Sequence, residues 1–259
     1  MLRRFALAMV TMIAVLAACQ GTPALTSPTE IITQGLEATS KLNSFHMSLA
    51  VDGSFSMPEA GGGTVKLDGT TLEADIDIQG RNVHLTFAIP ALLGLAGELL
   101  VIGPDLYFKS SLTGDKWTHQ AADVTGSASP APSLDPASIV DDVGDFLLKD
   151  GVVTTKLADV ACGDRQCYQV NVTIPPDLMD DAGAVASLDP SSIFGEALVL
   201  NLLFDRDQGW LTAVSTDVAS DEIGTFSATL TFSNFDEALD LTPPPSPEVT
   251  EGEVTLPFD

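Results

Sequence analysis

The sequence predicts an α+β fold in which one large antiparallel sheet of about eleven strands carries a few short helices. Apolar and polar residues alternate strictly along several segments, which is typical of strands with one apolar face and one solvated face. Between these segments, Ser-Pro and Asp-Pro sequences mark helix starts. A twisted sheet of this size rarely stays open and flat, so we expect it to curl.

The chain begins with the features of a bacterial lipoprotein signal. Two arginines, an apolar run from Phe5 to Leu16 and a lipobox ending at Cys19 follow one another. The apolar run is too short to cross a hydrocarbon core, which needs about 20 residues. We expect residues 1–18 to be removed, Cys19 to carry the lipid and residues 19–27 to form a tether. This predicts an extracytoplasmic protein anchored to the outer face of the cell membrane, and Gln20 leaves open which membrane holds the anchor.

The first folded element is a helix over about residues 28–42. Ser27-Pro28-Thr29-Glu30 forms a capping box with proline at the first helical position, and apolar residues at helical spacing follow it. Asp135-Pro136 and Asp189-Pro190 each predict the start of another helix. A short helix is expected at about 176–183.

The alternating segments predict the strands. In the first segment, Phe45, Met47 and Leu49 lie on one side, and His46 and Ser48 lie on the other. The same alternation, or a shorter apolar run, recurs along the chain. The expected strands cover 45–57, 64–67, 72–78, 83–89, 98–102, 105–110, 116–119, 152–160, 168–174, 197–204, 209–219 and 226–233.

The composition is that of one acidic globular domain. The formal net charge of −25 excludes a nucleic-acid partner, because proteins hold polyanions through lysine and arginine. Apolar residues make up 45% of the chain and charged residues only 18%, so the chain can bury a core. We expect a single domain over 28–242, followed by a Pro-rich, acidic and unstructured tail over 243–259.

Two cysteines remain after lipid attachment. Cys162 and Cys167 flank Gly163-Asp164, which supplies a hairpin turn, and this spacing predicts a disulfide in an extracytoplasmic protein. A metal site would need further ligands, and none lies nearby in the sequence. We therefore predict a disulfide and no metal.

No grouping of residues indicates catalysis. The three histidines, His46, His84 and His119, lie on separate strands, and no Ser, His and acid combination is apparent. Gly61-Gly62-Gly63 stands between two strands, so it indicates a hairpin loop and not a phosphate-binding loop. We expect a protein that is not an enzyme and has no cofactor.

Two segments are more apolar than a half-solvated sheet requires. Ala91–Gly97 is apolar without strand alternation, and Leu198–Phe204 is apolar on both faces. The second segment is either a central strand covered on both sides or a strand with one face against a cavity. Residues expected to line such a cavity are Phe45, Met47, Leu49, Val51, Leu85, Phe87, Leu92, Leu93, Leu95, Leu198, Leu200, Leu202 and Phe204.

Several short motifs occur together in this chain. Besides the lipobox they are Ser44-Phe45-His46-Met47, Gly103-Pro104-Asp105-Leu106-Tyr107-Phe108-Lys109 with Lys116-Trp117, Leu134-Asp135-Pro136, Cys167-Tyr168-Gln169-Val170 with Ile174-Pro175, and Phe235-Asp236 with Pro243. In these motifs, over most of residues 28–243, the chain resembles the LppX/LprA/LprF/LprG family of lipoproteins. The cysteine pair 162/167 is not part of that family pattern.

The resemblance implies a fold similar to that of the LolA/LolB lipoprotein carriers. In that fold, a half-barrel of antiparallel strands has helices over its concave face and encloses an apolar cavity for acyl chains. The resemblance implies a non-catalytic carrier of a lipid or lipoglycan, with an envelope transporter as a further candidate partner, and we expect a monomer. The alternative is an envelope sensor of the RseB/MucB type that binds a lipid or peptide and signals to a partner.

Overall fold

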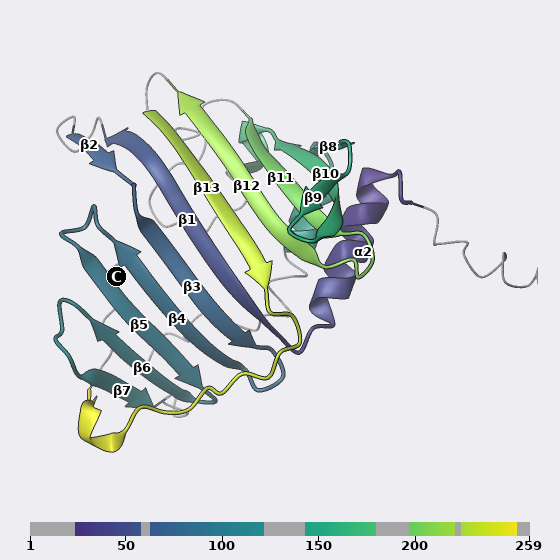
Figure 1. Cartoon of the computed structure of the whole chain (residues 1–259). Coiled ribbons are helices and arrows are strands. Elements are labelled where there is room, and N and C mark those ends of the chain that lie inside the picture. Colours follow the sequence, from purple (N-terminus) through teal and green to yellow (C-terminus); the bar gives the residue numbers. More distant parts are fainter. Residues whose placement is uncertain (1–23, 58–62, 122–142, 180–196, 221–223, 253–259) are drawn as a thin grey trace, which may run out of the picture.

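The computed structural model describes residues 24–57, 63–121, 143–179, 197–220 and 224–252 (Figure 1). Its centre is a 14-stranded sheet, which confirms the predicted class and exceeds the predicted number of strands. The strands are β1 (Ser44–Met57), β2 (Gly63–Lys66), β3 (Thr70–Asp77), β4 (Asn82–Ile89), β5 (Leu95–Ile102), β6 (Asp105–Ser110), β7 (Trp117–Ala121), β8 (Val153–Lys156), β9 (Val160–Cys162), β10 (Arg165–Ile174), β11 (Leu198–Asp205), β12 (Leu211–Ser220), β13 (Gly224–Ser233) and β14 (Val249–Glu251).

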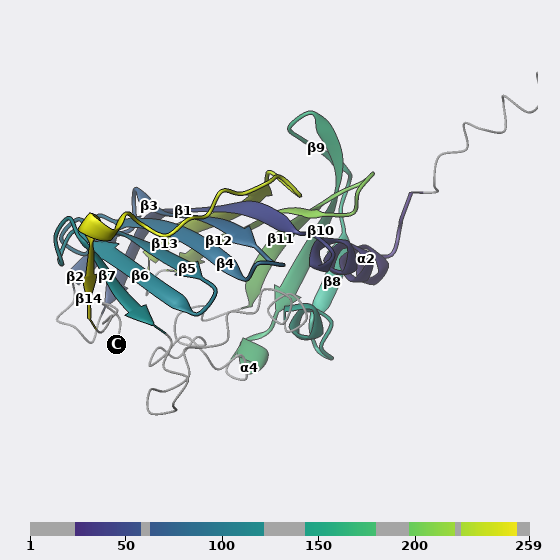
Figure 2. The ribbon, with the colours of Figure 1, turned by 90° about the horizontal axis from the view of Figure 1, so that it is seen from below.

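The sheet consists of two meanders that meet in the middle. The strand order is β14-β7-β6-β5-β4-β3-β1-β13-β12-β11-β10-β8, with β2 paired to β1 and β9 paired to β10. β1 therefore lies between β3, its near neighbour in sequence, and β13, which comes late in the chain. All these pairings are antiparallel except β14 with β7. Figure 2 shows that the sheet is bent along this order into an open half-barrel.

Helix α2 (Pro28–Ser40) begins as the capping box predicts. The Ser27 side chain accepts a hydrogen bond from the Glu30 amide, and proline occupies the first turn. Ile31, Ile32 and Leu36 form its buried stripe, which packs over β10 and β11 at one end of the sheet. Their neighbours in this core cluster are Leu147, Tyr168, Val170, Val172, Ile174, Met179, Leu202, Phe204 and Leu211.

Two short helical segments add to the same cluster. Residues 143–147 are helical, and Leu147 is buried. Helix α4 (Pro176–Met179) starts where the sequence predicts, and Met179 is buried. The helix starts predicted at residues 136 and 190, and the predicted stretch 180–183, lie outside the described residues, as do residues 1–18 and Cys19, the predicted site of lipid attachment.

The prediction of an unstructured tail is wrong for residues 243–252. A 3-10 helix, η3 (Ser246–Glu248), leads into β14, which pairs in parallel with β7. Val249 packs against a second small cluster made of Leu100, Tyr107 and Trp117. The reason is that β7 would otherwise be an edge strand with unpaired backbone groups, which this segment satisfies. Residues 253–259 lie outside the described part of the chain.

Candidate functional site

The strand register places one continuous apolar row across the sheet. Residues directly opposite each other in neighbouring strands point to the same face. One row starts at Val170 in β10, crosses β11, β12, β13, β1 and β3, and ends in β4. Its members after Val170 are Leu202, Val214, Leu230, Leu49, Leu72 and Phe87. We call the face that carries this row the inner face, and Figure 2 shows it as the concave side, where α4 also lies.

A parallel row on the inner face lies two residues further along the strands. It runs from Phe232 in β13 through Met47 to Ala74, and continues to Leu85 and Leu99. Successive rows are about 7 Å apart, since each residue advances about 3.4 Å along a strand. The inner face is therefore apolar in both directions.

The two ends of the inner face differ in how far they are covered. Near α2, Val170 and Leu202 are 0% and 2% exposed. Farther along the same row, Leu230, Leu49 and Leu72 are only half-buried, like most of the apolar side chains around them. Because α2 packs chiefly over β8, β10, β11 and β12, it leaves these side chains accessible. The result is an accessible apolar surface on β13, β1, β3 and β4.

On β13, β1, β3 and β4 the opposite, outer face carries the polar half of the alternation, whereas on β5, β6 and β7 it also carries the small apolar cluster of Leu100, Tyr107 and Trp117. His46 pairs with Asp75 across β1 and β3 at 2.8 Å, and Glu98 pairs with Lys109 across β5 and β6 at 2.7 Å. Burial raises the pKa of Glu98, but the hydrogen bonds and charges of Lys109 and His84 outweigh burial and lower it overall. A sheet with one face of this kind directs apolar ligands to its other face.

The C-terminal segment is attached to the outer side by a histidine. Two carboxylates flank His119, with Asp105 on Nε2 at 3.0 Å and Glu251 on Nδ1 at 2.9 Å. These hydrogen bonds raise the pKa of His119, against a smaller opposite effect of burial. The other two histidines also pair with carboxylates, His46 with Asp75 and His84 with Glu98.

The structure separates the predicted cavity residues into three groups. Met47, Leu49, Val51, Leu85 and Phe87 are half-buried on the accessible inner face. A second group is buried or packs against the core cluster; it consists of Phe45, Leu95, Leu198, Leu200, Leu202 and Phe204. The third group, Leu92 and Leu93, lies on an exposed turn.

Leu202 and Phe204, which were predicted to line a cavity, are 2% and 1% exposed and belong to the core cluster. Both lie beneath α2, whose Gly35 brings the helix against the Phe204 ring. The strand Leu198–Phe204 is apolar because one of its faces is core, whereas Val199 on the other face is 37% exposed. Alternation alone could not reveal where the helix would pack.

Sequence reasoning missed further inner-face residues, among them Leu72, Val214, Leu230 and Phe232. Leu72 and Leu230 lie opposite Leu49 on its two neighbouring strands. Their alternation was visible in the predicted strands 72–78 and 226–233, but the pairing of the last strand with the first was not. The pairing of β13 with β1 places Leu230 in the same inner-face row as Leu49.

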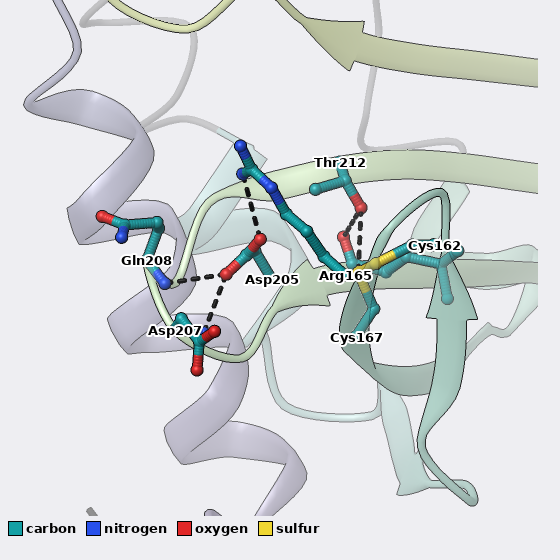
Figure 3. A network of polar contacts seen from close by, with 8 residues as sticks. Cys162, Arg165, Cys167, Asp205, Asp207, Gln208 and Thr212 are labelled. Carbon is teal, nitrogen blue, oxygen red and sulfur yellow. Dashed lines mark hydrogen bonds and ion pairs between the residues drawn. A yellow bond between two sulfur atoms is a disulfide. The ribbon is translucent and has the colours of Figure 1, made fainter.

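A second hollow lies between α2 and the turn that joins β11 to β12. This groove of about 770 Å³ is lined by charged and polar groups as well as by Phe204. Its wall is held by Asp205, whose Oδ1 accepts hydrogen bonds from the Asp207 and Gln208 amides, and whose Oδ2 pairs with Arg165 at 3.1 Å (Figure 3). These contacts satisfy a buried carboxylate, so we interpret them as structural.

The predicted disulfide between Cys162 and Cys167 is confirmed, with a Cα–Cα distance of 5.9 Å. It joins β9 to β10 beside the Asp205 network, as Figure 3 shows. In the described ranges, no set of three or more His, Cys, Asp or Glu side chains is arranged to hold a metal ion. No described helix is both long enough and apolar enough to span a membrane.

Solved structures share this architecture. LprF from Mycobacterium bovis is 18% identical, with a TM-score of 0.53, over 85% of this chain and 98% of its own. The lipoprotein LppX from Mycobacterium tuberculosis is 17% identical, with a TM-score of 0.49, over 83% of this chain and 97% of its own. A LolA superfamily protein from Nitrosomonas europaea is 12% identical, with a TM-score of 0.25, over 86% and 97%.

No protein-family model matches this chain, and no curated protein sequence does. Of the three structures, LprF is the one whose TM-score exceeds 0.5, so its fold is the basis of the assignment. The predicted resemblance is confirmed at that level. The chain has the LprF fold, a curved half-barrel of antiparallel strands with helices at one end of its concave face.

Proposed function

We propose that this protein is a cell-envelope lipoprotein that binds the acyl chains of a lipid or glycolipid on its inner face and carries or transfers that lipid without catalysing a reaction. The observation that carries the proposal is the half-buried apolar surface around Leu49 and Leu230, on strands whose side chains on the other face are mostly polar. Contiguous rows of partly exposed leucines are uncommon on a soluble surface and favour a binding site for apolar groups.

The size of the surface supports acyl chains as the ligand. From β12 to β4 the row crosses four strand spacings, or about 19 Å at roughly 4.8 Å each. An extended acyl chain fits along such a row. Transfer from a bilayer to the inner face changes the free energy little, because each methylene group moves from one apolar environment to another. Exposing a methylene group to water would cost roughly 0.8 kcal/mol, and this cost is avoided in both directions of transfer.

The experiment compares two matched pairs of substitutions on the same two strands. Leu49 and Leu230 face each other on the inner face, and Ala50 and Thr229 face each other on the outer face. Leu49→Gln with Leu230→Gln should reduce bound lipid about tenfold, since each change removes one leucine contact. Ala50→Gln with Thr229→Gln should leave it unchanged.

Bound lipid is measured by mass spectrometry of protein purified from bacterial envelopes, and circular dichroism verifies that each variant is folded. The proposal fails if the unmodified protein carries no lipid and takes up none from micelles. It also fails if both pairs reduce the lipid equally, because the inner face would then have no special role.

We also propose that Cys19 carries a lipid anchor. Cys19→Ala should move the protein from the detergent phase to the aqueous phase in phase partitioning without changing its thermal unfolding, because the anchor precedes a predicted tether and not the core. A variant that still enters the detergent phase would contradict the anchor.

A further inference from the structure

Two turns at one end of the sheet present leucines to solvent. In the β4–β5 turn (90–94), Leu92 is 47% exposed and Leu93 is 99% exposed. In the β6–β7 turn (111–116), Leu112 is 67% exposed. Single exposed apolar residues are ordinary, but three on adjacent turns are not. We call these two turns the leucine tips, and Figure 1 shows them on the same side of the sheet, at the left of the view.

The backbone holds Leu93 in its exposed position. Its φ of 55° lies in the left-handed region, which a leucine rarely adopts. Hydrogen bonds from the Leu92 amide to the Ile89 carbonyl, at 3.1 Å, and from the Gly94 amide to the Pro90 carbonyl, at 3.1 Å, close the turn. Asparagine or glycine would fit this conformation with less strain and would be more soluble. An exposed leucine in a strained conformation indicates a functional contact.

The two leucine tips form one surface. The Ser111 amide donates to the Ala96 carbonyl at 2.8 Å, and the Ala96 amide donates to the Ser111 hydroxyl at 3.1 Å. These bonds connect the start of the β6–β7 turn to β5, two residues beyond the β4–β5 turn. The two turns that carry Leu93 and Leu112 are therefore connected through β5.

The electrostatics identify the partner. Residues 90–97 carry no charge in a chain whose net charge is −25. In the other leucine tip, Asp115 and Lys116 balance each other. An anionic protein is repelled by anionic headgroups, so an approach through an uncharged tip favours a zwitterionic lipid surface.

The shape of the leucine tips favours a bilayer over a protein partner. A stable protein interface buries about 800 Å² on each side, which three side chains on two narrow turns do not supply. A bilayer accepts projecting side chains without a complementary pocket. The leucine tips also continue the inner face, because Ile89, the last residue of β4, follows Leu85 and Phe87 on the same side of that strand and pairs with Leu95 at the start of β5.

We propose that the leucine tips insert into the zwitterionic surface of a membrane, which places the β4–β5 end of the inner face at the bilayer. The docking proposal depends only on the leucine tips. The passage of lipid from the bilayer to the inner face depends on the proposed function as well.

The test is vesicle flotation with the full mature chain carrying Cys19→Ala, so that no lipid anchor contributes. The protein should float with phosphatidylcholine vesicles, and 0.5 M salt, roughly three times physiological ionic strength, should not release it. Leu93→Asp with Leu112→Asp should reduce the partition coefficient at least about tenfold, since each buried leucine contributes about that factor.

The matched control is Val153→Asp with Leu157→Asp. These two apolar residues are 60% and 38% exposed. They lie in β8 and just after it, at the end of the sheet opposite β14. This control should float like the parent protein. Leu93→Trp should show a blue-shifted emission with vesicles and quenching by brominated acyl chains. Flotation of the tip variant equal to that of its parent, absence of flotation in the parent, or release by salt would overturn the proposal.

Measuring bound lipid on the same variants separates the two proposals. The tip variant should keep its bound lipid and lose flotation, and Leu49→Gln with Leu230→Gln should lose lipid and keep flotation. If the inner-face variants show no effect on lipid while the tip variant fails to float, the docking stands and the proposed function fails.

Discussion

Gly35 of α2 is the position where one methyl group should reveal how closely the helix approaches the sheet. A Cβ atom built on Gly35 would lie well under 3.0 Å from two ring carbons of Phe204, and 3.1 Å from the Gly209 carbonyl oxygen. Phe204 is 1% exposed and belongs to the core cluster, so moving its ring would disturb the packing around it. Gly35→Ala therefore tests packing directly.

The expected sign follows from two opposing effects. Replacing a helical glycine by alanine stabilises an isolated helix by about 1 kcal/mol. Inserting a methyl group into a filled core costs about 1–3 kcal/mol, because α2 or the ring has to shift. We expect a net loss of up to about 2 kcal/mol, which lowers the melting temperature by up to roughly 8 °C for a domain of this size.

The assay is thermal and urea unfolding followed by circular dichroism. Phe204→Leu supplies the second variant, because it removes the ring that the new methyl group meets. On that background Gly35→Ala should be neutral or stabilising, and the change of sign measures the coupling between the two positions. A Gly35→Ala protein more stable than its parent would refute the close approach of α2 and β11. Thr33→Ala, on the exposed side of the same helix, should change stability by only a few tenths of a kcal/mol.

Three further predictions concern single contacts. Cys167→Ser should lower the free energy of unfolding by about 2 kcal/mol, which is the chain-entropy estimate for so short a loop. Urea unfolding with and without reductant measures this loss. Equal stability under both conditions would show that the hairpin is stable without the disulfide. Asp205→Ala should destabilise the protein by about 1–3 kcal/mol, because it leaves the Asp207 and Gln208 amides without their acceptor, while Asp205→Asn should cost less, since its amide oxygen still accepts them. The pKa of His119 is raised, so protonated His119 stabilises the attachment of β14. This contribution is complete at pH values below the ordinary histidine pKa near 6.5, and it is lost as the pH rises through the raised pKa. Hydrogen exchange at Val249–Glu251 should therefore show an additional increase over that range that His119→Gln abolishes, and an unchanged profile in the variant would contradict the histidine's role.

Local patterns in the sequence determined much of this protein. The capping box at Ser27 to Glu30 predicts where α2 begins, and the alternation from Phe45 to Val51 predicts which side chains of β1 share a face. The spacing of Cys162 and Cys167 predicts their disulfide. Each of these features depends on residues within a few positions of one another, so the information is complete in the local chain.

The tertiary structure alone decided which apolar strands are core and which are accessible. Leu202 and Leu49 were both predicted to line a cavity, yet α2 covers the first and leaves the second only half-buried. The pairing of β13 with β1 and the docking of β14 on β7 bring together segments about 180 and 130 residues apart, as their registers show. Burial is a property of what packs on top of a residue, and neither periodicity nor composition records that partner.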